Sequence, residues 1–267
     1  MGVGKFVGER KGKEFNELSK EANTKSKKVK RRQKKSSSSS SDTIQKVYET
    51  CKIMFASAKT GVVPPVEDVK RLQSVLDSMK PEDVGLSPAM QYFKTSKDGQ
   101  RPKITYLHLH ECDKFSMGIF CLPPSAVIPL HNHPGMTVFN TKRPTEVPLV
   151  MTTEEQHAEV RLAKIKADAD CTAPCNTSIL YPSAGGNLHC FTAKTACAVL
   201  DVLGPPYSDS DGRHCTYYLE HPFLNFPAAG VLVPGEDWER YAWLEDRGDP
   251  NEFSVVGTSY RGPKITE

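Results

Sequence analysis

Between Ile104 and Glu220 the chain alternates short β-rich runs with turn residues, and this pattern most restricts its fold. The runs read ITYLHLHE, FSMGIFCL, AVIPLH, MTVF, VRLAKI, TSILYP, LHCFTA, ACAVLDVL and CTYYLE. The period of two, broken by Gly, Pro and Asn, is typical of strands. No stretch between the runs is long enough for the helix of a parallel crossover. The sequence therefore predicts a mainly β sandwich or barrel.

Two amphipathic helices are expected ahead of these strands. Asp42 and Gln45 have the spacing of a capping box, and apolar residues keep helical spacing as far as Ala58. A second helix is expected from Val66 to Met79, and both helices should pack on the main domain. The part after residue 225 reads as irregular, with Trp238, Tyr241 and Trp243 as expected anchors.

The positive charge of the chain is concentrated in its first 42 residues. These hold 13 Lys/Arg and 5 Asp/Glu, whereas the remaining 225 residues hold 22 Lys/Arg and 27 Asp/Glu. We expect residues 1–42 to be a disordered tail and residues 43–267 to form the folded domain. The basic run between Lys25 and Lys35 is interpreted as a nuclear localisation signal; a nonspecific nucleic-acid patch and a merely solvated tail stay open.

Composition also bears on compartment and partners. No stretch reaches the roughly 18 apolar residues of a membrane span, and the first residues lack the apolar core of a signal peptide. We therefore expect a protein of the nucleus and cytoplasm, with no membrane partner and with its eight cysteines reduced. The net negative charge of residues 43–267 argues against nucleic acid as a partner of the domain.

Three histidines in two separate runs suggest a metal site. In HNHPG, His131 and His133 share one face of a strand, because side chains alternate along it. A His-x-His pair alone is more often an ordinary pair of histidines. A second run, YPSAGGNLH, places His189 directly after a tight turn at the start of another strand.

These two runs resemble the two halves of the cupin metal motif, and longer stretches resemble a narrower family. The stretches ITYLHLHECDKFSMGIFCLPPSAVIPLHNHPGMTVF, APCNTSILYPSAGGNLHCFTAKTACAVLDVLGPPYSDSDGRHCTYYLEHPF and YRGPKI look like the plant cysteine oxidases, relatives of 2-aminoethanethiol dioxygenase within the thiol dioxygenases. The resemblance implies a cupin-type double-stranded β-helix, or jelly roll, behind two N-terminal helices. It covers most of residues 43–267.

The resemblance also implies a chemistry and its residues. His131, His133 and His189 match three Fe(II) ligands. Asp201 matches an acidic residue near the iron, and Tyr207 matches a tyrosine that lines the substrate end. Cys215 and Tyr217 lie where the animal relative can form a thioether crosslink. The family uses O2 to oxidise the N-terminal cysteine of proteins of the group VII ethylene response factor type to its sulfinic acid. The product feeds oxygen-dependent degradation of the target, so the enzyme senses hypoxia. Monomers fit the family.

The residues agree with that chemistry. Three neutral ligands leave Fe(II) its double positive charge, which favours a thiolate, and both oxygen atoms of O2 can end on sulfur. Asp201 could pair with the substrate's N-terminal ammonium and select a terminal cysteine. The alternatives are that Asp201 is a turn residue at a strand end and that Tyr207 is a packed aromatic.

The chain departs from the family pattern after Phe139. Pro144 and Pro148 stand where strands are expected, so residues 140–159 read as a loop that replaces at least one strand. Two hypotheses follow. One is an active iron-dependent dioxygenase, and the other is a catalytically impaired cupin that acts as a nuclear binding protein.

Other candidate sites carry weaker patterns. His108 and His110 form a second His-x-His without a matching partner run, so we expect a solvent-facing strand edge. Cys171, Cys175 and Cys190 suggest a zinc site only weakly, and core thiols are the better interpretation.

Overall fold

The computed structural model describes residues 40–95, 101–143, 146–156, 160–172, 175–183, 187–225, 237–251 and 253–267. The expected tail, residues 1–42, therefore lies outside the described residues except for its last three. Within the described ranges, no helix is both long and apolar enough to cross a lipid bilayer.

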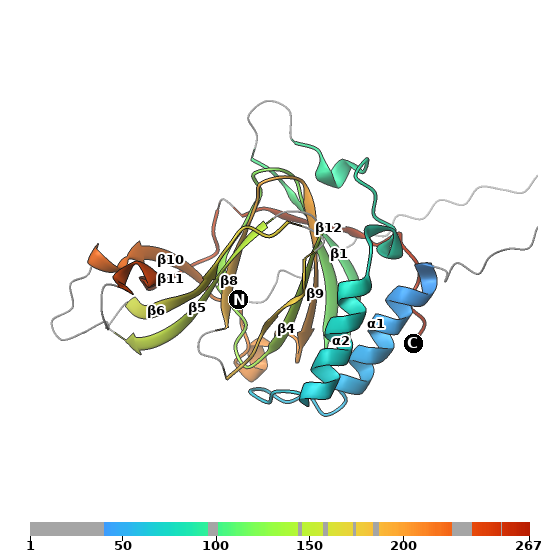
Figure 1. Ribbon diagram of the computed structural model, residues 1–267, viewed down its shortest axis with the longest axis horizontal. Helices are drawn as coiled ribbons and strands as arrows, with labels where there is room; N and C mark the ends of the chain where they lie inside the picture. Colours follow the sequence, from blue (N-terminus) through green and yellow to red (C-terminus); the bar gives the residue numbers. More distant parts are fainter. Residues whose placement is uncertain are drawn as a thin grey trace, which may run out of the picture.

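Two helices cover one side of a six-stranded sheet. The helices are α1 (Ser40–Met54) and α2 (Val66–Ser78), and the sheet has the order β12-β1-β2-β9-β4-β7. Figure 1 shows both helices lying together against one face of this sheet, beside β1, β9 and β4. Its strands are β1 (Ile104–Glu111), β2 (Ser116–Leu122), β4 (Thr137–Arg143), β7 (Ser178–Leu180), β9 (Cys197–Gly204) and β12 (Val255–Ser259).

The other six strands form a second, closed set. Their order is β10-β11-β6-β5-β8-β3, and the ring closes where Tyr217 of β10 pairs with His131 of β3. These strands are β3 (Val127–Asn132), β5 (Glu146–Gln156), β6 (Val160–Asp168), β8 (Leu188–Ala193), β10 (Tyr217–Pro222) and β11 (Tyr241–Arg247). Two sets of almost entirely antiparallel strands confirm the expected mainly β, cupin-type jelly roll behind two helices.

Alternation along β9 separates the core into two layers. Leu200 and Val202 pack with the buried faces of α1 and α2, whereas Val199 packs with Phe191 of β8. Because neighbouring side chains of a strand point to opposite faces, Asp201 faces the same way as Val199. Asp201 therefore lies on the interior side, between the two sets of strands.

The structure corrects the prediction of a loop at residues 140–159 over the part that it describes, residues 140–143 and 146–156, whereas Pro144 lies outside the described residues. β4 continues to Arg143, and β5 occupies Glu146–Gln156 between β6 and β8. Pro148 pairs with Phe191 of β8, but pairing between β5 and β6 begins only at Leu149. Pro148 thus lies beyond the end of the β5–β6 ladder, where a missing N–H removes no bond to β6.

Three smaller expectations were also wrong. The helix start implied by a capping box at Asp42 is not observed, because α1 begins at Ser40, and the Gln45 side chain bonds Glu49 and the backbone of Thr266. The stretch after residue 225 is not simply irregular, since it contains β11 and β12. Trp243 is fully buried as expected, but Trp238 is 41% exposed and anchors no core.

Candidate metal centre

Three histidine side chains converge between β3 and β8. His131 of β3 pairs directly with His189 of β8, and His133 follows the end of β3. The three ring centroids lie 4.6–4.7 Å apart in all three pairs. Their potential ligand atoms all lie within 4.8 Å of one another, and no other such group of His, Cys, Asp or Glu occurs in the described ranges.

Backbone carbonyls fix the orientation of two of these rings. Nδ1 of His131 lies 2.8 Å from the carbonyl oxygen of Pro129, and Nδ1 of His133 lies 3.2 Å from that of Asn187. An Nδ1–H that donates to a carbonyl leaves Nε2 as the metal-binding nitrogen, the usual arrangement around histidine ligands.

Burial keeps these imidazoles in the neutral form that a metal requires. His133 and His189 are 1% and 2% exposed. Burial lowers the pKa of His131 to about 4, and it also lowers the pKa of His133 well below its usual range. At neutral pH both rings are therefore neutral, with one proton each, and keep a lone pair on the other nitrogen for a cation.

The donor set fits one metal ion. Two nitrogens at about 2.1 Å from one ion lie at most about 4.2 Å apart. The ligand atoms of the three histidines all lie within 4.8 Å of one another, so small side-chain shifts bring them to one ion. Three neutral nitrogen donors suit a first-row transition metal rather than Ca²⁺ or Mg²⁺, which prefer oxygen. The fold and the site together indicate a metal-binding protein.

A glycine turn directs the chain away after His133. Gly135 has φ +68°, and a Cβ there would overlap the Thr60 side chain. Gly61 N donates to the Gly135 carbonyl at 2.8 Å, so the connection between α1 and α2 supports this turn. A larger residue at position 135 would strain the backbone and collide with that connection.

Asp201 lies in the interior but outside the histidine cluster. It is 6% exposed in the middle of β9, so the alternative of a turn residue at a strand end is wrong. Asn140, directly opposite in β4, donates from Nδ2 to Asp201 Oδ1 at 2.8 Å. The carboxylate is thus held by a fully buried neighbour.

Tyr207, Cys215 and Tyr217 form a cluster beside two of the histidines. The ring centroid of Tyr207 lies 5.7 Å from that of His133, and the ring centroid of Tyr217 lies 6.0 Å from that of His131. The Cys215 thiol lies close enough to both tyrosine hydroxyls to influence their ionisation. Burial raises the pKa of Tyr207 and of Tyr217, and raises that of Cys215 to about 11, so all three groups are protonated at neutral pH. The Tyr207 hydroxyl also donates to the Asn132 carbonyl at 2.8 Å.

The chain matches a family of thiol-oxidising enzymes. The PCO_ADO family model matches residues 75–265. Plant cysteine oxidase 2 of Arabidopsis thaliana is 54% identical over 230 residues, covering 84% of this chain and 83% of the relative. The chain belongs to the PCO_ADO family.

More distant members and solved structures give weaker matches. Human 2-aminoethanethiol dioxygenase is 30% identical over 225 residues, covering 74% of this chain and 82% of the relative. An RmlC-like cupin from Desulfovibrio desulfuricans has a TM-score of 0.31 and 20% identity, covering 46% of this chain and 94% of that one. Family membership rests on the family model and the sequence relatives.

The other candidate sites of this PCO_ADO chain do not join the metal centre. β1 is no edge strand, because it lies between β12 and β2. His108 is exposed, but the ring of His110 packs against Tyr48 and Phe115 at centroid distances of 4.9 and 5.0 Å. Cys171, Cys175 and Cys190 form no metal-ligand group among the described residues.

Three asparagines around the site were not predicted from the sequence. Asn140 holds Asp201, Asn187 holds His133, and Asn132 accepts from the backbone N–H of Thr216 at 2.8 Å. Only Asn187 carried a local signal, because asparagine after Gly-Gly favours a left-handed turn. Cross-strand partners such as Asn140 depend on register, which a single strand does not reveal.

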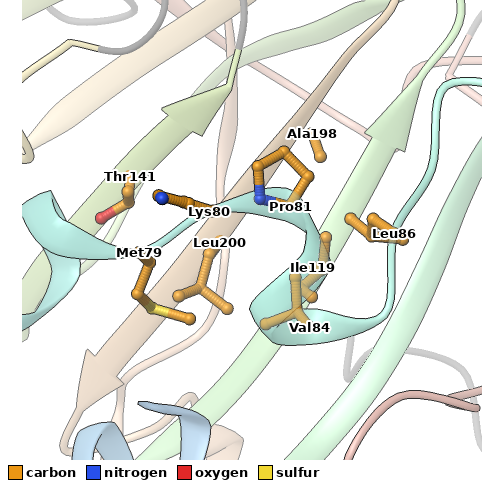
Figure 2. A pocket seen from close by; sticks show the side chains of 9 residues that line it. All are labelled: Met79, Lys80, Pro81, Val84, Leu86, Ile119, Thr141, Ala198 and Leu200. Atoms are coloured by element: carbon orange, nitrogen blue, oxygen red, sulfur yellow. The ribbon is translucent and has the colours of Figure 1, made fainter. Parts of the chain in front are cut away.

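A small apolar pocket lies on the other side of the β2–β9–β4 sheet. Figure 2 shows it between the segment after α2 and the outer face of the strands. Its lining residues are Met79, Lys80, Pro81, Val84, Leu86, Ile119, Thr141, Ala198 and Leu200. Leu200 and Asp201 are adjacent in β9 and face opposite ways, so this pocket is separated from the interior by the sheet itself.

Proposed function

We propose that this chain is an iron-dependent dioxygenase that oxidises the N-terminal cysteine of target proteins to cysteine sulfinic acid. The observation that carries the proposal is the convergence of His131, His133 and His189 within a jelly roll that is 54% identical to a plant cysteine oxidase. The reaction adds both atoms of O2 to the thiol sulfur. Sulfur loses four electrons and O2 gains four, so no external reductant is needed.

The three histidines would hold Fe(II) through their nitrogen atoms. When bound, the ion would supply a positive charge that favours the thiolate over the thiol and a redox-active centre for O2. The protein's own contribution is to hold three neutral imidazoles in place and to keep the surroundings dry. Phe191 serves the second purpose, since its buried ring lies 4.5 Å from that of His189.

We propose that Asp201 recognises the substrate's terminal ammonium. Its carboxylate lies on the interior side of β9, where Asn140 occupies one oxygen as a donor. A carboxylate held in a poorly solvated place pairs well with a cation. A peptide with a free amino terminus would therefore be preferred over one whose terminus is acetylated.

Tyr207 and Tyr217 would line the substrate end of the site. Both rings lie beside metal-site histidines, and both hydroxyls lie near the Cys215 thiol. In this arrangement they serve as a packed wall that holds β3 against the segment leading into β10. A Cys215–Tyr217 thioether remains a prediction.

The cellular role is proposed from family resemblance and the basic tail. Targets of the group VII ethylene response factor type, degradation through the oxidised terminus, and hypoxia sensing would follow from the oxidase reaction. The basic run between Lys25 and Lys35 supports entry into the nucleus as well as residence in the cytoplasm. We expect a monomeric enzyme.

The deciding experiment is mass spectrometry of a short peptide that begins with cysteine. The full chain is loaded anaerobically with Fe(II), and the peptide is measured with and without O2. We expect an O2-dependent gain of two oxygen atoms on the terminal cysteine, lost in His189→Ala. In Asp201→Asn we expect a smaller preference for the free over the acetylated terminus.

Thr177→Val is the matched control variant. Thr177 is buried and bonds Asp77 and Thr141 on the helix-facing side, so its loss weakens the fold without touching the histidines. It should retain oxidation. Bound iron and bound peptide without any oxygen gain would contradict the oxidase proposal and favour the alternative, an impaired cupin that binds partners in the nucleus.

A further inference from the structure

Asn187 connects the two separate runs that carry the histidines. It precedes His189 by two residues, yet its amide and its backbone carbonyl both bond the segment that carries His133. Its Nδ2 donates to the carbonyl oxygens of His133 and Met136, at 2.9 and 2.6 Å. Its own carbonyl oxygen lies 3.1 Å from the backbone nitrogen of His133 and 3.2 Å from Nδ1 of the same residue.

The conformation of Asn187 is specialised for these bonds. Its φ is +49°, in the left-handed region that asparagine tolerates better than other non-glycine residues. The side chain is 5% exposed, and its Oδ1 has no hydrogen-bond partner among the described residues. A buried acceptor without a partner is costly. The opposite orientation of the amide would place Oδ1 against the two carbonyl oxygens and lose both donor bonds, so the observed orientation is the more favourable one.

Asn187 therefore contacts His133 in two ways. The amide of Asn187 holds the turn from His133 to Met136, and its carbonyl receives the Nδ1–H of the same histidine. The first contact fixes where the ring is, and the second fixes which nitrogen carries the proton. Partners of this kind orient a histidine so that its other nitrogen faces the metal.

We propose that Asn187 is a positioning residue that locks His133 in its Nδ1–H form and sets the spacing between the two histidine runs. The proposal rests on the proposed metal site. It does not depend on which thiol is oxidised, or on whether oxidation occurs at all. It predicts that removal of one neutral amide, which is no ligand itself, weakens metal binding.

The sharpest test is Asn187→Gly. Glycine adopts φ +49° without strain, so this variant keeps the backbone and its carbonyl acceptor and removes only the amide. The metal-free full chain is titrated anaerobically with Fe(II) against a chromophoric chelator. We expect Fe(II) affinity to fall about 10- to 100-fold, the effect typical of losing a partner that orients a histidine ligand.

A second measurement reports on the ring itself. Long-range proton–nitrogen NMR of the metal-free chain distinguishes Nδ1–H from Nε2–H imidazoles. Wild type should give a single Nδ1–H signal pattern for His133. Asn187→Gly keeps the carbonyl acceptor, but without the amide the turn from His133 to Met136 is no longer held, so the ring should meet that carbonyl only part of the time. The variant should therefore give a mixture of the two tautomers. A purely structural loss of stability would not move this readout.

Thr177→Val is again the matched control, since it removes buried hydrogen bonds at a distance from the histidines. It should destabilise the fold but keep wild-type Fe(II) affinity and a single tautomer. If Asn187→Gly fails to fold, Asn187→Asp replaces it, because a carboxylate of the same shape cannot donate to the two carbonyls. Wild-type affinity with a single tautomer in the folded variant would overturn the proposal.

Discussion

Asn140 donates a 2.8 Å hydrogen bond from its amide to the carboxylate of Asp201, directly across the central strands β4 and β9. Both side chains are nearly inaccessible to solvent, at 0% and 6% exposed. A buried carboxylate is tolerated only where donors replace water, so the Asn140 amide helps to keep Asp201 in the interior. The same pairing ties the candidate substrate-binding acid in β9 to the neighbouring strand β4.

Replacement of Asn140 by alanine should destabilise the fold. The substitution removes one donor from Asp201 in a place that water does not reach, at a cost of about 1–3 kcal/mol. Urea unfolding of the full chain measures the loss. The double variant with Asp201→Asn should be less destabilised than the sum of the two single changes, because the two groups interact directly.

Additivity is the outcome that would count against this pairing. If the two substitutions add within about 0.5 kcal/mol, the residues act independently and the hydrogen bond contributes nothing measurable. Asn140→Ser provides a graded comparison, since a hydroxyl can still donate but from a shorter side chain. Its stability should lie between wild type and Asn140→Ala.

Much of the metal centre could be predicted because its signals are local. The spacing of His131 and His133 predicts that both side chains share one face of a strand, because side chains alternate along it. The glycines before His189 predict the turn that precedes the strand of His189. The two helices were predictable for the same reason, since apolar spacing is read from consecutive residues. The start of α2 at Val66 matches the prediction, and its end differs by one residue.

Other features depend on contacts that are distant in sequence. The Asn140–Asp201 bond spans 61 residues and exists only in one strand register. β5 was missed because proline argues against a strand, although it is acceptable beyond the end of a ladder. β12 was missed because it pairs in parallel with β1, which lies at the other end of the domain sequence. The sequence therefore predicted the histidine ligands but not the residues that hold the site in place through hydrogen bonds, such as Asn140.

Metal loading should stabilise the chain through the histidine cluster. A ligand that binds only the folded state raises its stability, by about 2.7 kcal/mol at a free concentration 100-fold above Kd. Thermal unfolding with and without Fe(II) under anaerobic conditions should show a higher midpoint in wild type, reversed by a chelator. His189→Ala should lose the shift, and Thr177→Val should keep it; an equal shift in both variants would place metal binding elsewhere.

Gly118 leaves space for the ring of Tyr106, and filling that space should displace the ring. A Cβ at this position would overlap the Tyr106 side chain, and Gly118 pairs directly with Asp201. Gly118→Ala should therefore cost about 1–3 kcal/mol of stability, as overpacking of a core does. Gly248→Ala is the control, because nothing lies within 4 Å of a Cβ there. Adding Tyr106→Ser to Gly118→Ala should recover part of the loss; no recovery would mean that the ring is not what resists the methyl group.

The Cys215 thiol should be slow to alkylate while the protein is folded. Burial raises its pKa to about 11 from the ordinary value of 9.0. Only the thiolate reacts, so at pH 8 the rate with iodoacetamide should be about 100-fold lower than in the urea-unfolded chain. Equal rates in the two states would show that the thiol is not protected. A Cys215–Tyr217 crosslink gives a third result, since the linked peptides would stay joined in a digest and would not react even when unfolded.

The same thiol should make stability depend on pH in the alkaline range. A raised folded-state pKa means that the folded chain holds the proton more tightly than the unfolded chain. The resulting stability is complete below pH 9 and declines as pH rises from 9 through 11. Cys215→Ala removes this titrating group, so the variant should lose less stability than wild type between pH 8 and pH 10 in urea unfolding. Because the nearby tyrosines are present in both chains, parallel pH profiles would mean that Cys215 does not carry this dependence.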